Sequence, residues 1–106
     1  MFKNAFLDGE SIINDRYFVA YKELNKIKAG ITILKPHKET RGHSHDGVEE
    51  VYFFVRGRGL MQINDKKFPV RAGDVVLIED GAFHKVFNPT SDELEFVVAF
   101  NKVETV

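Results

Sequence analysis

Three histidines and one glutamate in this chain have the side chains and the spacing of metal ligands. His43 and His45 are separated by one residue, so on an extended segment both imidazoles point to one face. Glu50 follows after a turn-like Asp-Gly pair at 46–47, and His84 comes later in the chain. Imidazole and carboxylate suit one divalent transition metal ion: Mn, Fe, Co, Ni, Cu or Zn. Four such ligands on an octahedral ion would leave two neighbouring positions for water, dioxygen or a bidentate substrate.

The elements that must position these ligands are strands. Short alternating apolar segments separated by Gly, Asn and Asp dominate the chain and predict an all-β domain. The expected strands are Tyr17–Glu23, Lys28–Leu34, Gly42–His45, Glu50–Arg56, Gly59–Ile63, Lys66–Val70, Asp74–Ile78, His84–Asn88 and Leu94–Phe100. No segment keeps a helical apolar period, and at most a short helical turn is expected near the N-terminus.

Length and composition favour one domain over residues 1–106, since 106 residues is close to the commonest domain size and ten Phe can fill a core. The chain has no cysteine, which excludes disulfides and thiolate ligands and agrees with a cytoplasmic location. The N-terminal residues lack the apolar core of a signal peptide, and the longest apolar runs are too short to cross a bilayer. The net charge of −1 gives no footprint for nucleic acid. We therefore expect neither a membrane nor a nucleic-acid partner.

Parity sorts the two faces of the strand that carries Glu50. If Glu50 points inward, then Tyr52 and Phe54 also point inward. The opposite face is fully apolar and consists of Val51, Phe53 and Val55. An exposed face of this kind would be a sticky patch, so we expect it to be covered by a second copy in a homodimer. The alternative is that apolar residues of the N-terminal segment wrap over it, namely Phe2, Phe6, Leu7, Ile12 and Ile13.

Two segments carry a family resemblance. The segment 42–57, which holds His43, His45 and Glu50, resembles the first motif of the cupin superfamily, and the segment 73–88, which holds His84, resembles the second. The resemblance implies a small single-domain metal-binding cupin of the conserved-barrel type, with a jelly-roll (double-stranded β-helix) fold. It also implies one metal ion bound by all four of these residues.

The chain departs from the cupin pattern at two positions. Glu79 stands where the family usually has proline, and His37 stands where the first motif often begins with glycine. Neither departure replaces a ligand. Glu79 is expected to alter only the turn before the His84 strand, where Gly81 supplies a permissive backbone. His37 is expected to be solvated in a polar loop.

Residues beside the metal are candidates for a substrate pocket. Tyr52 shares the parity of Glu50 and is the candidate catalytic residue, as a proton donor or as an orienting group. A packed ring with a satisfied hydroxyl is an equal alternative. Phe54 and Arg41 complete the expected pocket. Arg41 belongs to a group of cations that would favour an anionic ligand, although a solvated charged face is the preferred explanation of that group: Lys35, Lys38, Arg41, Arg56 and Arg58.

A fold does not determine a function, and three hypotheses remain open. The stretch 40–45, with 50–52 and 57–59, is similar to the metal-binding stretch of cupin-type phosphoglucose isomerases. This similarity implies a metal-dependent isomerase or epimerase that acts on a sugar or sugar phosphate. The second hypothesis is a metal-dependent dioxygenase of small organic substrates, and the third is a non-catalytic barrel that binds or senses a small molecule. An enzyme is favoured over a binding protein.

Overall fold

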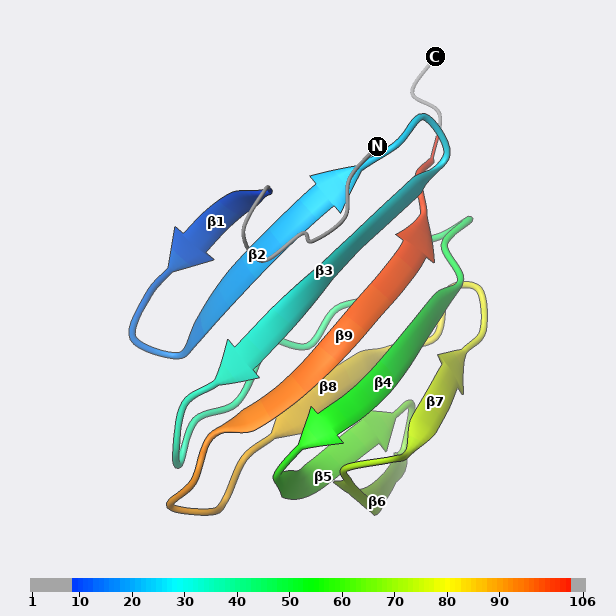
Figure 1. Ribbon diagram of the computed structural model, residues 1–106. Coiled ribbons are helices and arrows are strands. Elements are labelled where there is room, and N and C mark those ends of the chain that lie inside the picture. The colour runs from blue at the N-terminus through cyan, green and yellow to red at the C-terminus, as the bar shows by residue number, and fades with distance from the viewer. Residues whose placement is uncertain (1–8, 104–106) are drawn as a thin grey trace.

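The computed structural model describes residues 9–103, and the strands of this part of the chain form an antiparallel barrel (Figure 1). The strands are β1 (Glu10–Ile13), β2 (Tyr17–Glu23), β3 (Ile27–Leu34), β4 (Glu50–Arg56), β5 (Arg58–Ile63), β6 (Lys66–Arg71), β7 (Val75–Ile78), β8 (His84–Phe87) and β9 (Leu94–Asn101). The described residues contain no helix, and so none that could span a membrane. The prediction of an all-β fold is confirmed.

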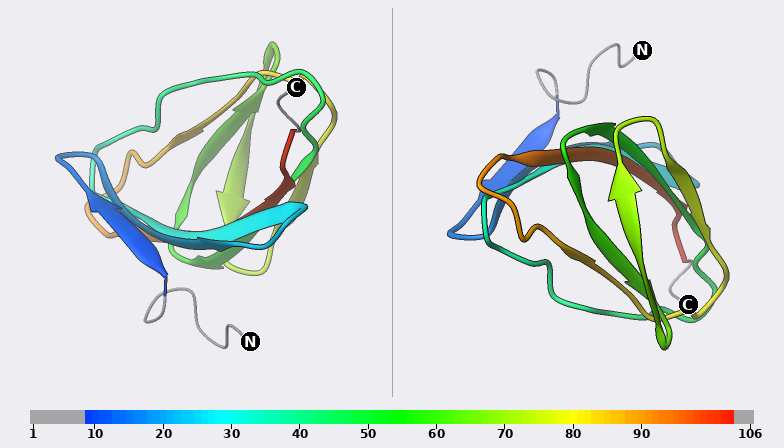
Figure 2. Two further views of the ribbon diagram at one scale, coloured as in Figure 1. Left: turned by 90° about the horizontal axis from the view of Figure 1, so that it is seen from above. Right: turned by 90° about the horizontal axis from the view of Figure 1, so that it is seen from below.

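The strands form two sheets. One has six strands in the order β1-β2-β3-β9-β4-β7, and the other has three in the order β6-β5-β8. The sheets face one another, as the end-on views show (Figure 2). The segment between β3 and β4 joins the second sheet only through isolated bridges, from Glu39 to Phe87 and from His43 to His84. The result is the jelly-roll barrel that the motifs imply.

Alternation along β4 separates the barrel interior from its outer surface. Glu50, Tyr52 and Phe54 are 8%, 7% and 2% exposed. Their neighbours Phe53 and Val55 are 41% and 47% exposed on the opposite face. The predicted parity of this strand is therefore correct. The interior is filled by a single cluster of buried apolar side chains: Leu34, Tyr52, Phe54, Met61, Val70, Ile78, Val86, Leu94 and Phe96.

Two expectations about local structure need correction. The segment 42–45 was expected to be a strand but forms only one bridge, in which the amides of His43 and His84 exchange hydrogen bonds with the opposite carbonyls at 3.2 and 3.0 Å. The turn at Gly47, with φ of 81°, ends the extended segment before a ladder can continue. The strand β1 was not expected from the sequence, whereas residues 1–8 lie outside the described residues, so a helical turn there stays a prediction. Phe2, Phe6 and Leu7, the start of the expected N-terminal cover, lie outside the described residues.

Candidate metal centre

Three of the four predicted ligands come together at one site, where Glu50 and His84 are buried and His43 is exposed. One ligand atom each from His43, Glu50 and His84 lies within 4.8 Å of the others. Glu50 begins β4 and His84 begins β8, so the two sheets supply one ligand each. His43 comes from the segment between β3 and β4, and its backbone bridge to His84 holds it beside the other two. Residues that are far apart in the sequence are thus brought together by strand pairing.

Two atoms of this cluster are buried without a hydrogen-bond partner. Glu50 Oε2 and His84 Nε2 lie 2.8 Å apart on side chains that are only 5% and 4% exposed. Neither atom makes a hydrogen bond of acceptable geometry to any described residue. A buried polar atom left unpaired costs about 1–3 kcal/mol, which a cation bound by both atoms would offset. Neighbouring ligands with bonds of about 2.1 Å to one ion lie about 3 Å apart, close to the observed separation. The pair therefore fits a transition metal ion.

Backbone carbonyls orient the two imidazoles of the cluster. His84 Nδ1 donates a hydrogen bond to the carbonyl of Ala82 at 3.0 Å, and His43 Nδ1 donates to the carbonyl of Arg41 at 3.4 Å. A carbonyl can only accept, so each Nδ1 carries the proton and each Nε2 keeps a lone pair. An imidazole whose second nitrogen is held in this way is the usual state of a metal-bound histidine.

The electrostatic surroundings of the two imidazoles differ. Burial, together with the neighbouring His84, lowers the pKa of His43 and favours its neutral form. Burial also lowers the pKa of His84, but close contact with the Glu50 carboxylate and the Ala82 carbonyl outweighs this effect and leaves the pKa raised. The carboxylate therefore attracts positive charge to the position of the His84 ring, as it would attract a metal ion.

His45 lies next to this cluster but outside its tight group. Its ring centroid is 4.9 Å from that of His43, and both side chains line the same cavity. The ligand atom of His45 is not among those that lie within 4.8 Å of one another. Its role as a fourth ligand therefore stays a prediction.

The cluster of candidate ligands opens into a cavity of about 360 Å³ on the inner face of the six-stranded sheet. Arg41 and Tyr52 line this cavity, as the candidate substrate pocket requires. Phe54 does not line it; its ring packs beneath, with its centroid 6.3 Å from that of Tyr52 and 5.3 Å from that of Phe96. Burial and the nearby charge of Glu50 raise the pKa of Tyr52, so its hydroxyl is a donor rather than a base.

The cavity includes residues that the sequence reasoning did not single out. Lys28, Gly30 and Thr32 face it from β3, and Tyr21 faces it from β2. The ammonium of Lys28 lies 4.2 Å from the centre of the Tyr21 ring. Alternation places Lys28, Gly30 and Thr32 on one face of their strand, but the order β3-β9-β4 was needed to show which face is inside.

The two departures from the cupin pattern lie outside the cavity. His37 is exposed, has a φ of 58°, and donates its amide hydrogen to the Thr90 carbonyl at 3.1 Å. The carbonyl of Glu79 accepts a hydrogen bond from the Ala82 amide at 3.1 Å in the turn before β8. Gly81 in that turn has a φ of 75°, as the permissive backbone expected there requires.

Asn88 has a structural position. It is 1% exposed, and its Nδ2 donates to the carbonyls of Leu34, Lys35 and Asp92 at 3.1, 3.1 and 2.8 Å. Its Oδ1 accepts the Thr90 amide hydrogen at 3.1 Å, which stabilises the turn that follows β8.

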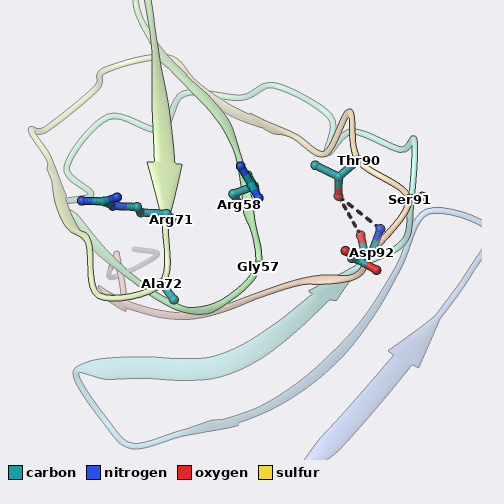
Figure 3. A pocket seen from close by; sticks show the side chains of 7 residues that line it. All are labelled: Gly57, Arg58, Arg71, Ala72, Thr90, Ser91 and Asp92. Atoms are coloured by element: carbon teal, nitrogen blue, oxygen red, sulfur yellow. Dashed lines mark hydrogen bonds between the residues drawn. The ribbon is translucent and has the colours of Figure 1, made fainter.

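A second hollow, of about 770 Å³, lies at the other end of the three-stranded sheet (Figure 3). Arg58 at the start of β5 and Arg71 at the end of β6 line it, whereas His84 pairs with the far end of β5. Figure 3 shows Arg71 pointing away from the Thr90–Asp92 turn, so the charged groups do not converge. None of the predicted ligands lines this hollow, and the chemistry belongs to the smaller cavity.

Fold and site together define a small jelly-roll barrel with a histidine–carboxylate cluster that could hold a metal ion. Residues 30–100 match the family model described as the cupin domain. The chain therefore belongs to the cupin family, as its two motifs indicate.

Curated relatives agree with this assignment. An oxalate-binding protein of Thermotoga maritima is 34% identical over 64 residues, which are 60% of this chain and 53% of that protein. An uncharacterized protein of Methanocaldococcus jannaschii is 41% identical over 56 residues, which are 53% of this chain and 45% of that protein. The chain thus matches about half the length of these two relatives.

Solved structures show the same barrel. A structure from Thermotoga maritima, described as a predicted oxalate decarboxylase, is 26% identical with a TM-score of 0.83, covering 97% of this chain and 100% of that one. A structure from Acidithiobacillus ferrooxidans, named as a candidate sugar phosphate isomerase, is 22% identical with a TM-score of 0.76, covering 92% and 69%. The second likeness concerns the fold alone.

Proposed function

We propose that this cupin binds a small carboxylate ligand on a divalent transition metal ion held by His43, His45, Glu50 and His84. The observation that carries the proposal is the pair of buried, unpartnered atoms Glu50 Oε2 and His84 Nε2, which lie 2.8 Å apart beside the cavity. A bound ion would supply a Lewis-acidic centre for the anionic oxygens of the ligand. Which of the suitable metals binds is a matter for elemental analysis.

Residues of the cavity support an anionic ligand. The Arg41 side chain lines it and has no ion-pair partner in the described part of the chain. A guanidinium in this position can hold a carboxylate through two parallel hydrogen bonds. The name of the oxalate-binding relative fits the same chemistry.

Isomerisation of a sugar phosphate is the less favoured function. It requires a group that takes a proton from carbon, and among the described residues that line the cavity Glu50 is the only carboxylate. Glu50 is proposed as a metal ligand, and the raised pKa of Tyr52 keeps its hydroxyl protonated, so it cannot take up a proton. Dioxygenase chemistry and ligand sensing stay predictions that oxygen uptake by the metal-loaded protein would separate. A cytoplasmic location also stays a prediction.

The outer face of the six-stranded sheet supports a homodimer. Val51 and Leu77 are paired across β4 and β7, as are Phe53 and Val75, and three of these four side chains are 41% to 73% exposed. We infer that a second copy of the chain covers this face, because exposed apolar patches of this kind usually mark an interface. The cover would be related by two-fold symmetry, which is the commonest arrangement of homo-oligomers.

Calorimetric titration with oxalate tests the proposed ligand binding. Oxalate is expected to bind the metal-loaded protein and to lose its affinity when the metal is removed. Glu50→Gln should weaken metal binding by more than about 100-fold, since loss of even an outer-shell partner of a ligand typically costs 10–100-fold. Glu49→Gln is the matched control, because it makes the same change at the adjacent residue, which is exposed. Equal oxalate binding with and without metal would refute the proposal.

A further inference from the structure

The cavity extends well beyond the cluster of candidate ligands, along the inner face of the six-stranded sheet. In the register of β4, β9 and β3, Glu50 lies in one row with Phe100 and Lys28. The next row runs from Tyr52 through Val98 to Gly30, and a third row brings Phe96 beside Thr32. The described cavity residues come from all three rows. Its volume of about 360 Å³ is in the range of sites for organic ligands, about 300–1,000 Å³, and oxalate would occupy only part of it.

The middle row contains a glycine, Gly30, which lines the cavity. A Cβ atom at Gly30 would lie 2.6 Å from the Ala20 carbonyl oxygen and 2.8 Å from Tyr21 Cβ. The neighbouring strand β2 therefore leaves no room for a side chain at this position. Gly30 therefore contributes only backbone atoms to the cavity wall.

Two side chains with hydroxyl groups line this part of the cavity. Tyr52 is 7% exposed and Thr32 is 8% exposed, and they stand on the strands at either side of β9. Neither hydroxyl forms a side-chain hydrogen bond to any residue of 9–103. Both hydroxyls are therefore available to hydrogen-bond the polar groups of a ligand in this cavity.

The remaining walls are apolar and rich in aromatic rings. Val19 and Val98 line the cavity, together with four aromatic side chains besides Tyr52: Tyr17, Tyr21, Phe96 and Phe100. Such walls gain from contact with an aromatic ring through apolar burial and edge or face contacts. A two-carbon dianion would leave them in water.

We propose, on the basis of the proposed function, that the ligand is an aromatic acid with a second oxygen beside its carboxylate, such as an aromatic 2-oxo acid. The two neighbouring oxygens bind the metal, with the Tyr52 hydroxyl as their hydrogen-bond donor. The ring lies along Val98 over the bare backbone of Gly30. A polar group at the far end of the ring bonds the Thr32 hydroxyl.

Calorimetric titration of the metal-loaded protein with four acids tests this inference. Oxalate tests the metal site, and pyruvate and phenylpyruvate differ only in the ring. 4-Hydroxyphenylpyruvate adds the distal polar group. We expect phenylpyruvate to bind at least about tenfold more tightly than pyruvate, because the ring is buried. The added hydroxyl should tighten binding several-fold further.

Three variants test whether the gain in affinity from the aromatic ring and its 4-hydroxyl group comes from contacts in the cavity. Val98→Phe should fill the space for the ring and so abolish the advantage of phenylpyruvate over pyruvate. Val55→Phe is the matched control, since Val55 is 47% exposed on the outer face. Thr32→Val keeps the shape of the side chain and should remove only the gain from the 4-hydroxyl group.

The outcomes separate this inference from the proposed function. Binding of oxalate and pyruvate with no gain for phenylpyruvate would overturn the aromatic ligand and leave the carboxylate site standing. A gain that survives in Val98→Phe would also overturn it, and an unchanged 4-hydroxyl effect in Thr32→Val would overturn the distal contact. Failure of all four acids to bind would refute the proposed function itself.

Discussion

The two faces of the six-stranded sheet differ in polarity, and the difference is the reverse of the usual one. Near the candidate ligands the inner face carries polar side chains, and Glu50, Tyr52 and Thr32 are all less than 9% exposed. The outer face of β4 and β7 is apolar, and Leu77 on it is 73% exposed. An antiparallel sheet with one wet side has the opposite arrangement, apolar inside and polar outside. This difference agrees with the proposed ligand site on the inner face and with the proposed dimer contact on the outer face.

The largest expected difference in stability is between alanine variants of the adjacent residues Phe54 and Phe53. Phe54→Ala should lower the free energy of unfolding by about 3–5 kcal/mol, because the ring is 2% exposed and its loss leaves a cavity. Phe53→Ala should cost less than about 1 kcal/mol in dilute protein, since a 41% exposed ring loses less burial. Urea denaturation at low protein concentration measures both. Equal losses would show that the outer face is as deeply buried as the interior.

Metal addition should raise the free energy of unfolding, and the rise should depend on the candidate ligands of the inner face. At a free metal concentration of 100 times the dissociation constant, the free energy of unfolding should rise by about 2.7 kcal/mol. His84→Gln should abolish this rise, because the unpartnered Nε2 is lost. His37→Gln should keep it, since His37 does not line the cavity. Thermal shift with and without chelator compares the three proteins; an unchanged shift in His84→Gln would exclude His84 as a ligand.

Leu77→Glu should act on the outer face alone. A charge placed in the proposed dimer contact should raise the dimer dissociation constant at least tenfold, or about 1.4 kcal/mol. Lys67→Glu, on the exposed surface of the three-stranded sheet, is the control and should leave the dimer intact. Analytical ultracentrifugation reports both. A wild-type chain that stays monomeric at every concentration would contradict the prediction.

The smallest expected effect concerns the backbone at His37. Its φ of 58° is unfavourable for a side chain by about 1–2 kcal/mol, so His37→Gly should raise stability by up to about 1 kcal/mol after the entropy of glycine is counted. Lys38→Gly, at a neighbour without a positive φ, should lower stability instead. Thermal denaturation distinguishes the two signs. A loss of metal binding in His37→Gly would contradict its position outside the site.

Sequence reasoning succeeded where a local rule sufficed. Alternation alone placed Glu50 and Tyr52 inside and Phe53 outside, and the two motifs identified the fold. It failed where long-range pairing decides, as for Thr32 and Gly30, whose place in the cavity depends on the register of β3 with β9. It also failed at 42–45, because a single pair of hydrogen bonds to His84 replaces the expected strand. Whether Phe54 could reach the cavity depended on packing, which alternation does not describe.

The segment between β3 and β4 carries Arg41, His43 and His45 but belongs to neither sheet; two bridges and several separate hydrogen bonds hold it against the barrel. Segments outside strands tolerate sequence change more readily than strands do, so side chains here can be varied while the nine-stranded frame of residues 9–103 stays the same. An engineer could accordingly exchange this segment as a cassette, keeping Glu50 and His84 as fixed anchors. New donor sets, and hence new metal preferences, could be selected without redesigning the barrel.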